Sequence, residues 1–200
     1  MRRQEDHYSR RARQQGFAAR SVFKLQELQE RFRLIRPEAR VLDLGAAPGS
    51  WSQYCLQALA GRGLVVGVDL NEPSFERGKG TGEAEFRFLR GDLYAPEVEA
   101  RLTEWGPYDL VLSDAAPHTS GSHLVDAQAS LELAGRALEL ALRLLKSGGG
   151  TVIKVFQGGQ EGELLGRLRE GFTRARAFKP EASRSQSREV YFLGLGRKPG

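Results

Sequence analysis

The stretch that decides the fold covers residues 42–51 and reads Leu42-Asp43-Leu44-Gly45-Ala46-Ala47-Pro48-Gly49-Ser50-Trp51. Its apolar start predicts the end of a buried strand, and the pattern of residues 50–59 predicts a helix directly after it. Small residues between the two let a ligand approach the backbone, and a helix N-terminus offers unpaired N–H groups. The stretch therefore predicts either a ligand-binding loop at a strand end or a plain tight turn.

Outward from this loop, short apolar runs alternate with helical patterns. The runs predict strands over residues 40–44, 64–69, 86–89, 108–113 and 150–156, with weaker candidates at 175–178 and 190–195. Apolar residues at spacings of three and four predict helices over residues 21–32, 50–59, 131–145 and 161–172. Strands separated by helices favour an α/β fold, with a mostly parallel seven-stranded sheet and helices on both faces.

Length and composition narrow the class of protein. The 200 residues are 40% hydrophobic, which is enough for one domain with an ordinary core. No apolar run approaches the roughly 20 residues that cross a bilayer, and the charged N-terminus is not followed by an apolar segment. A single cysteine, Cys55, excludes an internal disulfide framework and a Cys-based zinc site. We expect a cytoplasmic protein with no membrane partner, and nothing demands more than a monomer.

Charge is distributed unevenly along the chain. Residues 1–24 and 174–200 each carry a net charge of +5, whereas residues 25–173 carry −5. Basic ends on a mildly acidic body indicate a polyanionic partner, although a solvated tail and face would have the same composition. We expect residues 1–35 to form a basic segment and helix that bind this polyanion, and residues 36–200 to form the main domain.

Acidic residues follow the second and third predicted strands, at Asp69 and Asp92. In doubly wound sheets ligands bind at the carboxyl ends of the strands, where a carboxylate accepts hydrogen bonds from ribose hydroxyls or an adenine amino group. The loop after the first strand is neither G-x-G-x-x-G nor a phosphate-binding loop with Gly-Lys-Ser/Thr. These features together predict an adenosine-containing ligand, and an NAD-dependent oxidoreductase is disfavoured.

Two further positions, Asp114 and Lys154, carry side chains that could take part in a reaction. Asp114 follows the fourth strand, and the surrounding Ser-Asp-Ala-Ala-Pro lacks the Asn/Asp-Pro-Pro-Tyr/Phe of enzymes that methylate amino groups of nucleic acids. Lys154 lies inside an apolar strand, where an ammonium group costs several kcal/mol unless it is paired. Either Lys154 forms a structural ion pair with Asp114, or it is a catalytic amine.

Five segments occur in the order that is typical of one family: residues 20–25 (RSVFKL), 43–49 (DLGAAPG), 113–114 (SD), 154–158 (KVFQG) and 187–191 (SREVY). Together they resemble the FtsJ/RrmJ family of RNA ribose 2′-O-methyltransferases. The resemblance covers nearly the whole chain and implies a Rossmann-like class I methyltransferase fold with S-adenosyl-L-methionine as cofactor. Ser50, where the bacterial form often has glycine, and His118, where Asn is expected, depart from the family pattern.

The resemblance also implies roles for residues of this chain. The catalytic set falls on Lys24, Asp114, Lys154 and Glu189. The cofactor-binding set falls on Gly45, Ala46, Pro48, Gly49, Trp51, Asp69, Asp92 and Asp114. Lys154 is expected to orient the hydroxyl and to accept or withdraw its proton, and the other three to position and balance its charge. No metal is expected, because the three histidines lack the spacing of metal ligands.

The implied reaction is methyl transfer to the ribose 2′-hydroxyl of a uridine in 23S rRNA, within the 50S ribosomal subunit. The RNA-binding residues are expected at both basic ends, at Arg10, Arg11, Arg13, Arg20, Arg184 and Arg188, with Arg2 and Arg3 beside them. One alternative keeps the chemistry and changes the substrate to tRNA or another RNA. Another is an inactive RNA-binding module with a Rossmann-like fold, although such a module has no need for a lysine in an apolar strand.

Overall fold

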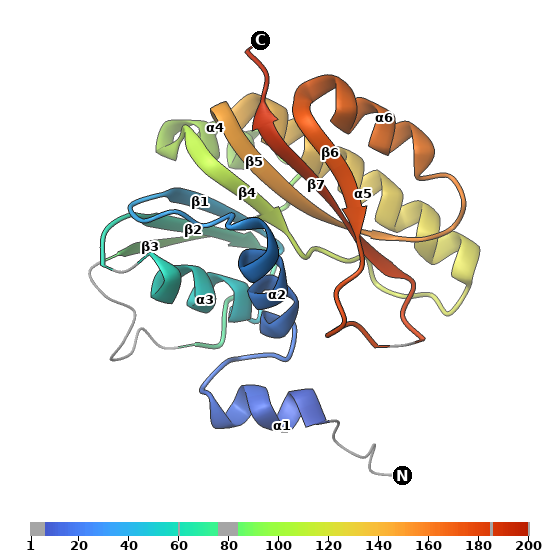
Figure 1. The fold of residues 1–200 in the computed structure, drawn as a ribbon, viewed down its shortest axis with the longest axis horizontal. Coiled ribbons are helices and arrows are strands. Elements are labelled where there is room, and N and C mark those ends of the chain that lie inside the picture. Colours follow the sequence, from blue (N-terminus) through green and yellow to red (C-terminus); the bar gives the residue numbers. More distant parts are fainter. Residues whose placement is uncertain (1–6, 60, 76–83, 185, 200) are drawn as a thin grey trace.

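Seven strands form one sheet in the order β3-β2-β1-β4-β5-β7-β6 (Figure 1). Residues 7–59, 61–75, 84–184 and 186–199 are described by a computed structural model, and Arg2 and Arg3 lie outside them. The strands are β1 (Arg40–Leu44), β2 (Leu64–Asp69), β3 (Glu85–Arg90), β4 (Tyr108–Ser113), β5 (Leu145–Phe156), β6 (Phe172–Phe178) and β7 (Glu189–Arg197). The helices are α1 (His7–Gln14), α2 (Val22–Phe32), α3 (Ser50–Ala58), α4 (Pro96–Trp105), α5 (His123–Leu144) and α6 (Gly162–Gly171).

Strands β1 to β5 pair in parallel, and β7 is antiparallel to both β5 and β6. The predicted fold class, a mostly parallel seven-stranded sheet with helices on both faces, is confirmed. The chain leaves β1 towards β2 on one side, whereas β4 pairs with β1 on the other side. This reversal opens a crevice at the carboxyl ends of β1 and β4, which is where ligands bind in such sheets.

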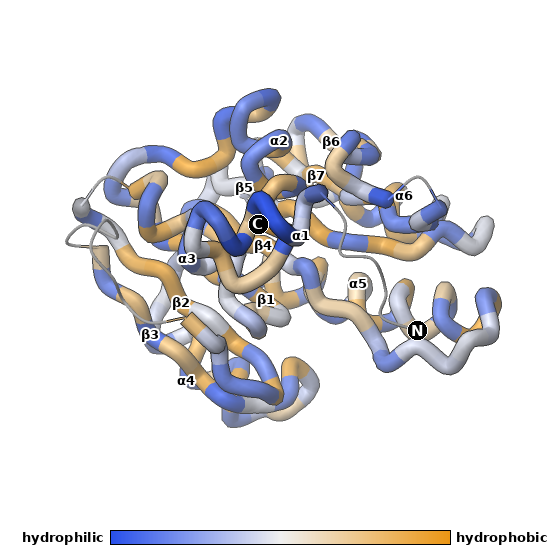
Figure 2. Tube along the Cα trace, turned by 90° about the horizontal axis from the view of Figure 1, so that it is seen from below, coloured by the Kyte–Doolittle hydropathy of each residue, from blue (hydrophilic) through white to orange (hydrophobic). Residues whose placement is uncertain are grey.

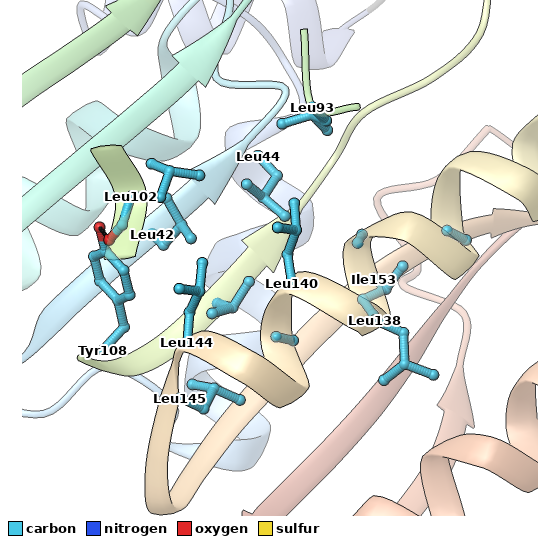
Figure 3. Close-up of a cluster of buried hydrophobic side chains, with 14 of the residues drawn as sticks. Leu42, Leu44, Leu93, Leu102, Tyr108, Leu138, Leu140, Leu144, Leu145 and Ile153 are labelled. Atoms are coloured by element: carbon cyan, nitrogen blue, oxygen red, sulfur yellow. Dashed lines mark hydrogen bonds between the residues drawn. The ribbon is translucent and has the colours of Figure 1, made fainter. Parts of the chain in front are cut away.

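Side chains along each strand point alternately to the two faces of the sheet, so the hydrophobic core forms two layers, one on each face. One face of the sheet packs on α4, α5 and α6 through residues such as Leu42, Val111 and Ile153 (Figure 3). The other face packs on α2 and α3 through residues such as Val41, Leu110 and Val152. Cys55 is fully buried in this second layer, and burial raises the pKa of its thiol well above the ordinary value. Cys55 is therefore a core residue and not a nucleophile.

Five predicted boundaries differ from the structure. Helix α5 begins at His123 rather than at residue 131, and it ends before Leu145, which is extended and pairs with Tyr108. Strand β5 therefore starts at residue 145 and not at 150, so Gly148 and Gly149 lie within the strand. Helix α6 ends at Gly171, because Phe172 turns to extended backbone and opens β6 before the predicted residue 175.

Two helices were not predicted, α1 and α4. Helix α4 carries a signal that the sequence analysis missed: Pro96 in its first turn, followed by Glu97 and Glu99. Helix α1 carries no apolar stripe, because Ala12 is its only buried residue among those described, and Figure 2 shows its hydrophilic colouring. It is held against α2 by a small cluster that includes Phe17 and Phe23. No described helix combines the length and apolarity needed to cross a membrane.

Candidate active site

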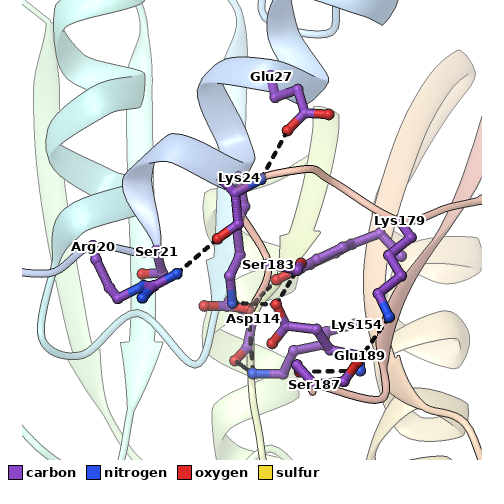
Figure 4. A network of polar contacts seen from close by, with 12 residues as sticks. Arg20, Ser21, Lys24, Glu27, Asp114, Lys154, Lys179, Ser183, Ser187 and Glu189 are labelled. Atoms are coloured by element: carbon purple, nitrogen blue, oxygen red, sulfur yellow. Dashed lines mark hydrogen bonds and ion pairs between the residues drawn. The ribbon is translucent and has the colours of Figure 1, made fainter. Parts of the chain in front are cut away.

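Four charged side chains meet at the carboxyl edge of the sheet (Figure 4). Lys24 comes from α2, Asp114 from the end of β4, Lys154 from β5 and Glu189 from the start of β7. The Lys154 Nζ atom lies 3.2 Å from Asp114 Oδ1, and the Lys24 Nζ atom lies 2.6 Å from Glu189 Oε1. We call these four residues the tetrad. Two cations and two anions balance, so the group tolerates its burial.

Strand register explains why residues so distant in sequence meet. In the parallel pairing of β4 with β5, Ser113 lies opposite Ile153, which places the next residues, Asp114 and Lys154, side by side. In the antiparallel pairing of β5 with β7, Phe156 lies opposite Glu189. The tetrad thus depends on strands that begin and end at the same edge of the sheet.

The structure gives Lys154 the ion pair that the sequence left as one of two alternatives. Its ammonium group also donates a hydrogen bond to the backbone oxygen of Asp114, at 2.6 Å. Only 8% of the Lys154 side chain and 17% of the Asp114 side chain are exposed. The pair holds the amine at the mouth of the crevice, where an ammonium group can donate a hydrogen bond to a ligand.

Two residues that support the tetrad had no role in the sequence analysis. The Tyr191 hydroxyl donates to Asp114 Oδ1 at 2.8 Å, and burial raises the pKa of this phenol, so it stays a donor. The Ser183 hydroxyl donates to Glu189 Oε1 at 2.6 Å. Tyr191 lies two residues from Glu189 on a strand, so both face one side, and this spacing could have identified it. No pattern in the sequence points to Ser183.

The loop between β1 and α3 is shaped by two glycines. Gly45 has φ +78°, and a Cβ there would lie 2.6 Å from the Cα of Ala115. Gly49 has φ +116°, and a Cβ there would lie 2.2 Å from the ring of Phe75. Side chains are excluded at both positions, so the backbone of the loop stays close to the ends of β2 and β4. The Gly45 and Ala46 N–H groups donate to the Val68 carbonyl at the end of β2.

Two of the predicted ligand-binding carboxylates, Asp69 and Asp92, follow strands β2 and β3. Asp69 accepts hydrogen bonds from the backbone N–H groups of Ala47 (3.1 Å) and Asn71 (2.8 Å), and Asp92 accepts one from Tyr94 (3.0 Å). Each carboxylate keeps further oxygen lone pairs that can accept hydrogen bonds from a ligand. Pro48 continues the loop, and its carbonyl accepts a hydrogen bond from Ser74 (2.8 Å).

Trp51 is a buried side chain on α3. Its indole N–H donates to the Ser21 carbonyl at 2.9 Å, and its ring lies 5.8 Å from that of Tyr191. The indole therefore joins α3 to α2 and to the strand that carries the tetrad. Ser50, the departure from the family pattern, shares a hydrogen bond of 2.8 Å with Ser21, so its hydroxyl strengthens the same junction.

Asp43 is a second functional candidate that the sequence analysis missed. It is fully buried at the end of β1, and desolvation raises the pKa of its carboxyl group to about 7, against a hydrogen bond from Ser52 that lowers it. Its Oδ1 atom has no hydrogen-bond partner among the residues that the structure describes. An unpaired buried carboxylate oxygen beneath a glycine-shaped loop fits a ligand that brings a cationic or hydrogen-bonding group, as S-adenosylmethionine does.

The predicted RNA-binding arginines fall into two groups. Arg20 and Arg184 line one cavity of about 390 Å³ together with Lys24 and Glu189 of the tetrad. We call it the basic cavity. The exposed residues Arg10, Arg11 and Arg13 lie on α1, and Arg188 is exposed beside Glu189.

The basic cavity is held in place by contacts between α2 and the segment that precedes β7. The Arg20 guanidinium donates to the Ala182 carbonyl at 2.8 Å, and Glu27 accepts from the backbone of residues 181 and 182. Among the described residues, no cluster of three His, Cys, Asp or Glu side chains is placed to hold a metal ion.

Comparison with known proteins places the chain in a family. The model of the FtsJ-like methyltransferase family matches residues 17–197. A protein of Syntrophobacter fumaroxidans named ribosomal RNA large subunit methyltransferase E is 44% identical over 193 residues, which cover 95% of this chain and 94% of that protein. A protein of the same name from Treponema denticola is also 44% identical, covering 96% of this chain and 95% of its own length.

A solved structure shares the fold. A chain from Plasmodium falciparum, described as a ribosomal RNA methyltransferase, superposes with a TM-score of 0.77 at 23% identity, covering 92% of this chain and all of its own. At this identity the likeness concerns the fold alone. The family model spans residues 17–197, a range that contains the four positions of the tetrad, and the two relatives cover nearly the whole chain. The chain therefore belongs to the FtsJ-like methyltransferase family.

Proposed function

We propose that this enzyme methylates the ribose 2′-hydroxyl of a uridine in 23S rRNA, within the 50S ribosomal subunit. The names of the relatives support ribosomal RNA of the large subunit as the substrate. The observation that carries the chemistry is the ion pair of Lys154 and Asp114, buried beside the loop between β1 and α3. In this proposal one chain provides every catalytic residue, so a monomer suffices. The enzyme acts in the cytoplasm, where its ribosomal substrate is found.

Members of this family use S-adenosylmethionine, which when bound supplies an electrophilic methyl group on a sulfonium. In this chain Asp69 and Asp92 would hold the adenosine part, and the loop from Gly45 to Gly49 would hold the amino-acid part near Asp43 and Trp51. Asp114 would face the reacting groups from the end of β4.

In this proposal the tetrad activates the ribose 2′-hydroxyl, which is a poor nucleophile. A ribose hydroxyl must lose its proton as it attacks. In this proposal Lys154 binds the hydroxyl oxygen and, once it has released its own proton, accepts the proton of the hydroxyl. Asp114 and Tyr191 hold the amine in position. Lys24 and Glu189 form the second pair, which orients the ribose and keeps the site neutral. Alignment of the hydroxyl with the methyl group provides much of the rate.

Methyl transfer from labelled S-adenosylmethionine tests this function. The acceptors are under-methylated 50S particles, free 23S rRNA and bulk tRNA, followed by nuclease mapping. We expect label as a 2′-O-methyl nucleotide in the 50S particle, and a loss of at least about 100-fold in rate for Lys154→Ala, in line with the typical contribution of a proton-transfer group.

A matched control is available in the same strand. Lys146 also pairs with an aspartate, Asp109, at 2.9 Å, but at the opposite end of the sheet. Lys146→Ala should therefore keep the wild-type rate. Label in tRNA alone would keep the chemistry and overturn the substrate. No label in any acceptor, despite tight cofactor binding, would favour an RNA-binding module without activity.

A further inference from the structure

A larger cavity opens between the start of α5 and the connection from β5 to α6, which run beside each other in Figure 1. Its volume is about 580 Å³, and apolar side chains form much of its lining, among them Leu124, Val125 and Phe156. We call it the α5 cavity. Leu124 is 77% exposed and Val125 is 57% exposed, although both are large and apolar. Exposed apolar residues gathered around a hollow mark a surface that binds something.

The wall of the α5 cavity is built rigidly. The Phe156 N–H donates to the hydroxyl of Ser130, a buried residue of α5, at 3.0 Å. A Cβ on Gly158 would lie 2.6 Å from the Cβ of Ala127, so only glycine lets this connection pack against α5. These contacts fix the end of β5, and with it Phe156, before any ligand arrives.

Phe156 also reaches the tetrad. The centre of its ring lies 5.8 Å from the Nζ atom of Lys154, two residues earlier on the strand. In a nucleotide the base is attached to the carbon next to the one that bears the 2′-hydroxyl. A ribose whose hydroxyl contacts Lys154 therefore carries its base within a few ångströms of that amine, which is where Phe156 lies.

The two cavities that adjoin the tetrad differ in the charge of their lining residues. The basic cavity contains Arg20, Lys24 and Arg184, which suit phosphates. The α5 cavity contains Glu132 and Glu161 and no Lys or Arg among its described lining, so it disfavours the RNA backbone. An uncharged base with an apolar face suits it instead.

We propose that the α5 cavity receives the base of the target nucleotide, stacked on Phe156, with the amides of Gln128 and Gln160 at its lining to bond the base edge. Unstacked RNA bases are bound in this way by aromatic side chains and by groups that both donate and accept hydrogen bonds. The inference rests on the proposed function and adds the site that selects the base.

Kinetics on under-methylated 50S particles test the proposal. Phe156→Ala should lower kcat/KM for the particle by roughly 10- to 100-fold, the effect of losing one base–aromatic stack, and Phe156→Tyr should restore it. Leu165→Ala, which truncates a half-buried apolar residue of α6 outside the cavity, is the control for lost stability and should keep the wild-type value. The pH–rate profile of Phe156→Ala should match that of the wild type.

A changed pH–rate profile would mean that Phe156 acts through Lys154, and would overturn the base site. An unchanged kcat/KM for Phe156→Ala would overturn it as well. If the wild-type enzyme labels no ribosomal RNA, the proposed function fails first and the base site fails with it. If the wild type labels the particle and Phe156→Ala does so equally well, only the base site fails.

Ultraviolet cross-linking of the particle to the enzyme gives a direct reading. With S-adenosylhomocysteine bound, we expect a nucleotide attached to the peptide that contains Phe156 or Leu124, and this nucleotide should be the one that is methylated. Cross-links confined to ribosomal protein at this peptide would show a protein-docking surface instead. Cross-links to RNA only at the basic ends would likewise overturn the proposal.

Discussion

Buried charges set the properties of single residues at this site. Lys154 and Asp114 are mutually neutralised, and so are Lys24 and Glu189, whereas Asp43 has no cation beside it. Removing one partner of a buried pair typically costs 3–5 kcal/mol, because the other charge is left alone. We therefore expect variants of the tetrad residues to lose stability as well as the proposed activity, so each activity assay needs a folding measurement beside it.

Asp43 makes stability depend on pH. Its carboxyl pKa is near 3.8 in the unfolded chain and about 7 in the folded protein. Between these values the folded state binds a proton that the unfolded state does not, so the free energy of unfolding falls as pH rises. The total loss is on the order of 4 kcal/mol once pH exceeds 7, at roughly 1.4 kcal/mol for each unit of pKa difference. Asp43→Asn should abolish this slope in urea unfolding measured from pH 5 to 8.

Asp109→Asn is the control for this measurement. Asp109 lies on β4 at the opposite end of the sheet and is paired with Lys146. Its variant keeps Asp43 and should keep the falling stability. An equally flat response in both variants, or a wild-type protein whose stability rises from pH 5 to 8, would show that Asp43 is not the source.

At the scale of elements, glycines decide where backbone segments approach. The loop between β1 and α3 needs Gly45 because of its positive φ and its contact with Ala115. Gly166 lies within α6, and a Cβ there would meet nothing within 4 Å. One glycine is thus required by the tertiary structure, and the other only weakens a helix.

Replacing Gly45 and Gly166 by alanine should change the stability of the protein in opposite directions. Gly45→Ala should destabilise the protein by more than about 2 kcal/mol, because strained backbone and a steric clash add together. Gly166→Ala should stabilise it by about 0.5–1 kcal/mol through helix propensity. Thermal unfolding at equal protein concentration measures both. A stable Gly45→Ala variant that still binds S-adenosylmethionine would contradict the role given to this loop.

On the scale of the whole molecule, the distribution of charge is the basis of the proposed RNA binding. The two basic ends of the sequence come together in space, since Arg20 and Arg184 line one cavity. If about six phosphates are contacted, a plot of log affinity against log salt should have a slope near −4, at roughly 0.7 per phosphate of a single strand. A slope near zero would contradict an electrostatic interface.

The slope of the same plot can show which arginines contact phosphates. Arg184→Ala should reduce the magnitude of the slope by about 0.7 if it holds one phosphate. Arg62→Ala is the control, because Arg62 is an exposed arginine between α3 and β2, near Glu38 and outside the basic cavity. Equal slopes for the two variants would place the phosphates elsewhere.

Much of the architecture could be read from the sequence alone. Apolar runs and helical spacing report local structure, so the alternation of strands and helices, the fold class and the family were predicted and are confirmed. Asp114, Lys154 and the loop with Gly45 stand out within their own segments, whereas Lys24 and Glu189 were expected only through the family resemblance. The catalytic roles of all four tetrad residues stay predictions. Helix ends such as that before Leu145 were missed, since strand pairing and not local preference sets them.

Only the tertiary structure decided which groups are partners. It pairs Lys24 with Glu189 and Lys154 with Asp114, and it adds Tyr191 and Ser183 as donors to the two carboxylates. Such pairs join residues up to 165 positions apart in the chain, and their contact depends on strand register and on the packing of α2. The raised pKa of Asp43 has the same origin, because desolvation is a property of everything packed around a group and not of its neighbours in sequence.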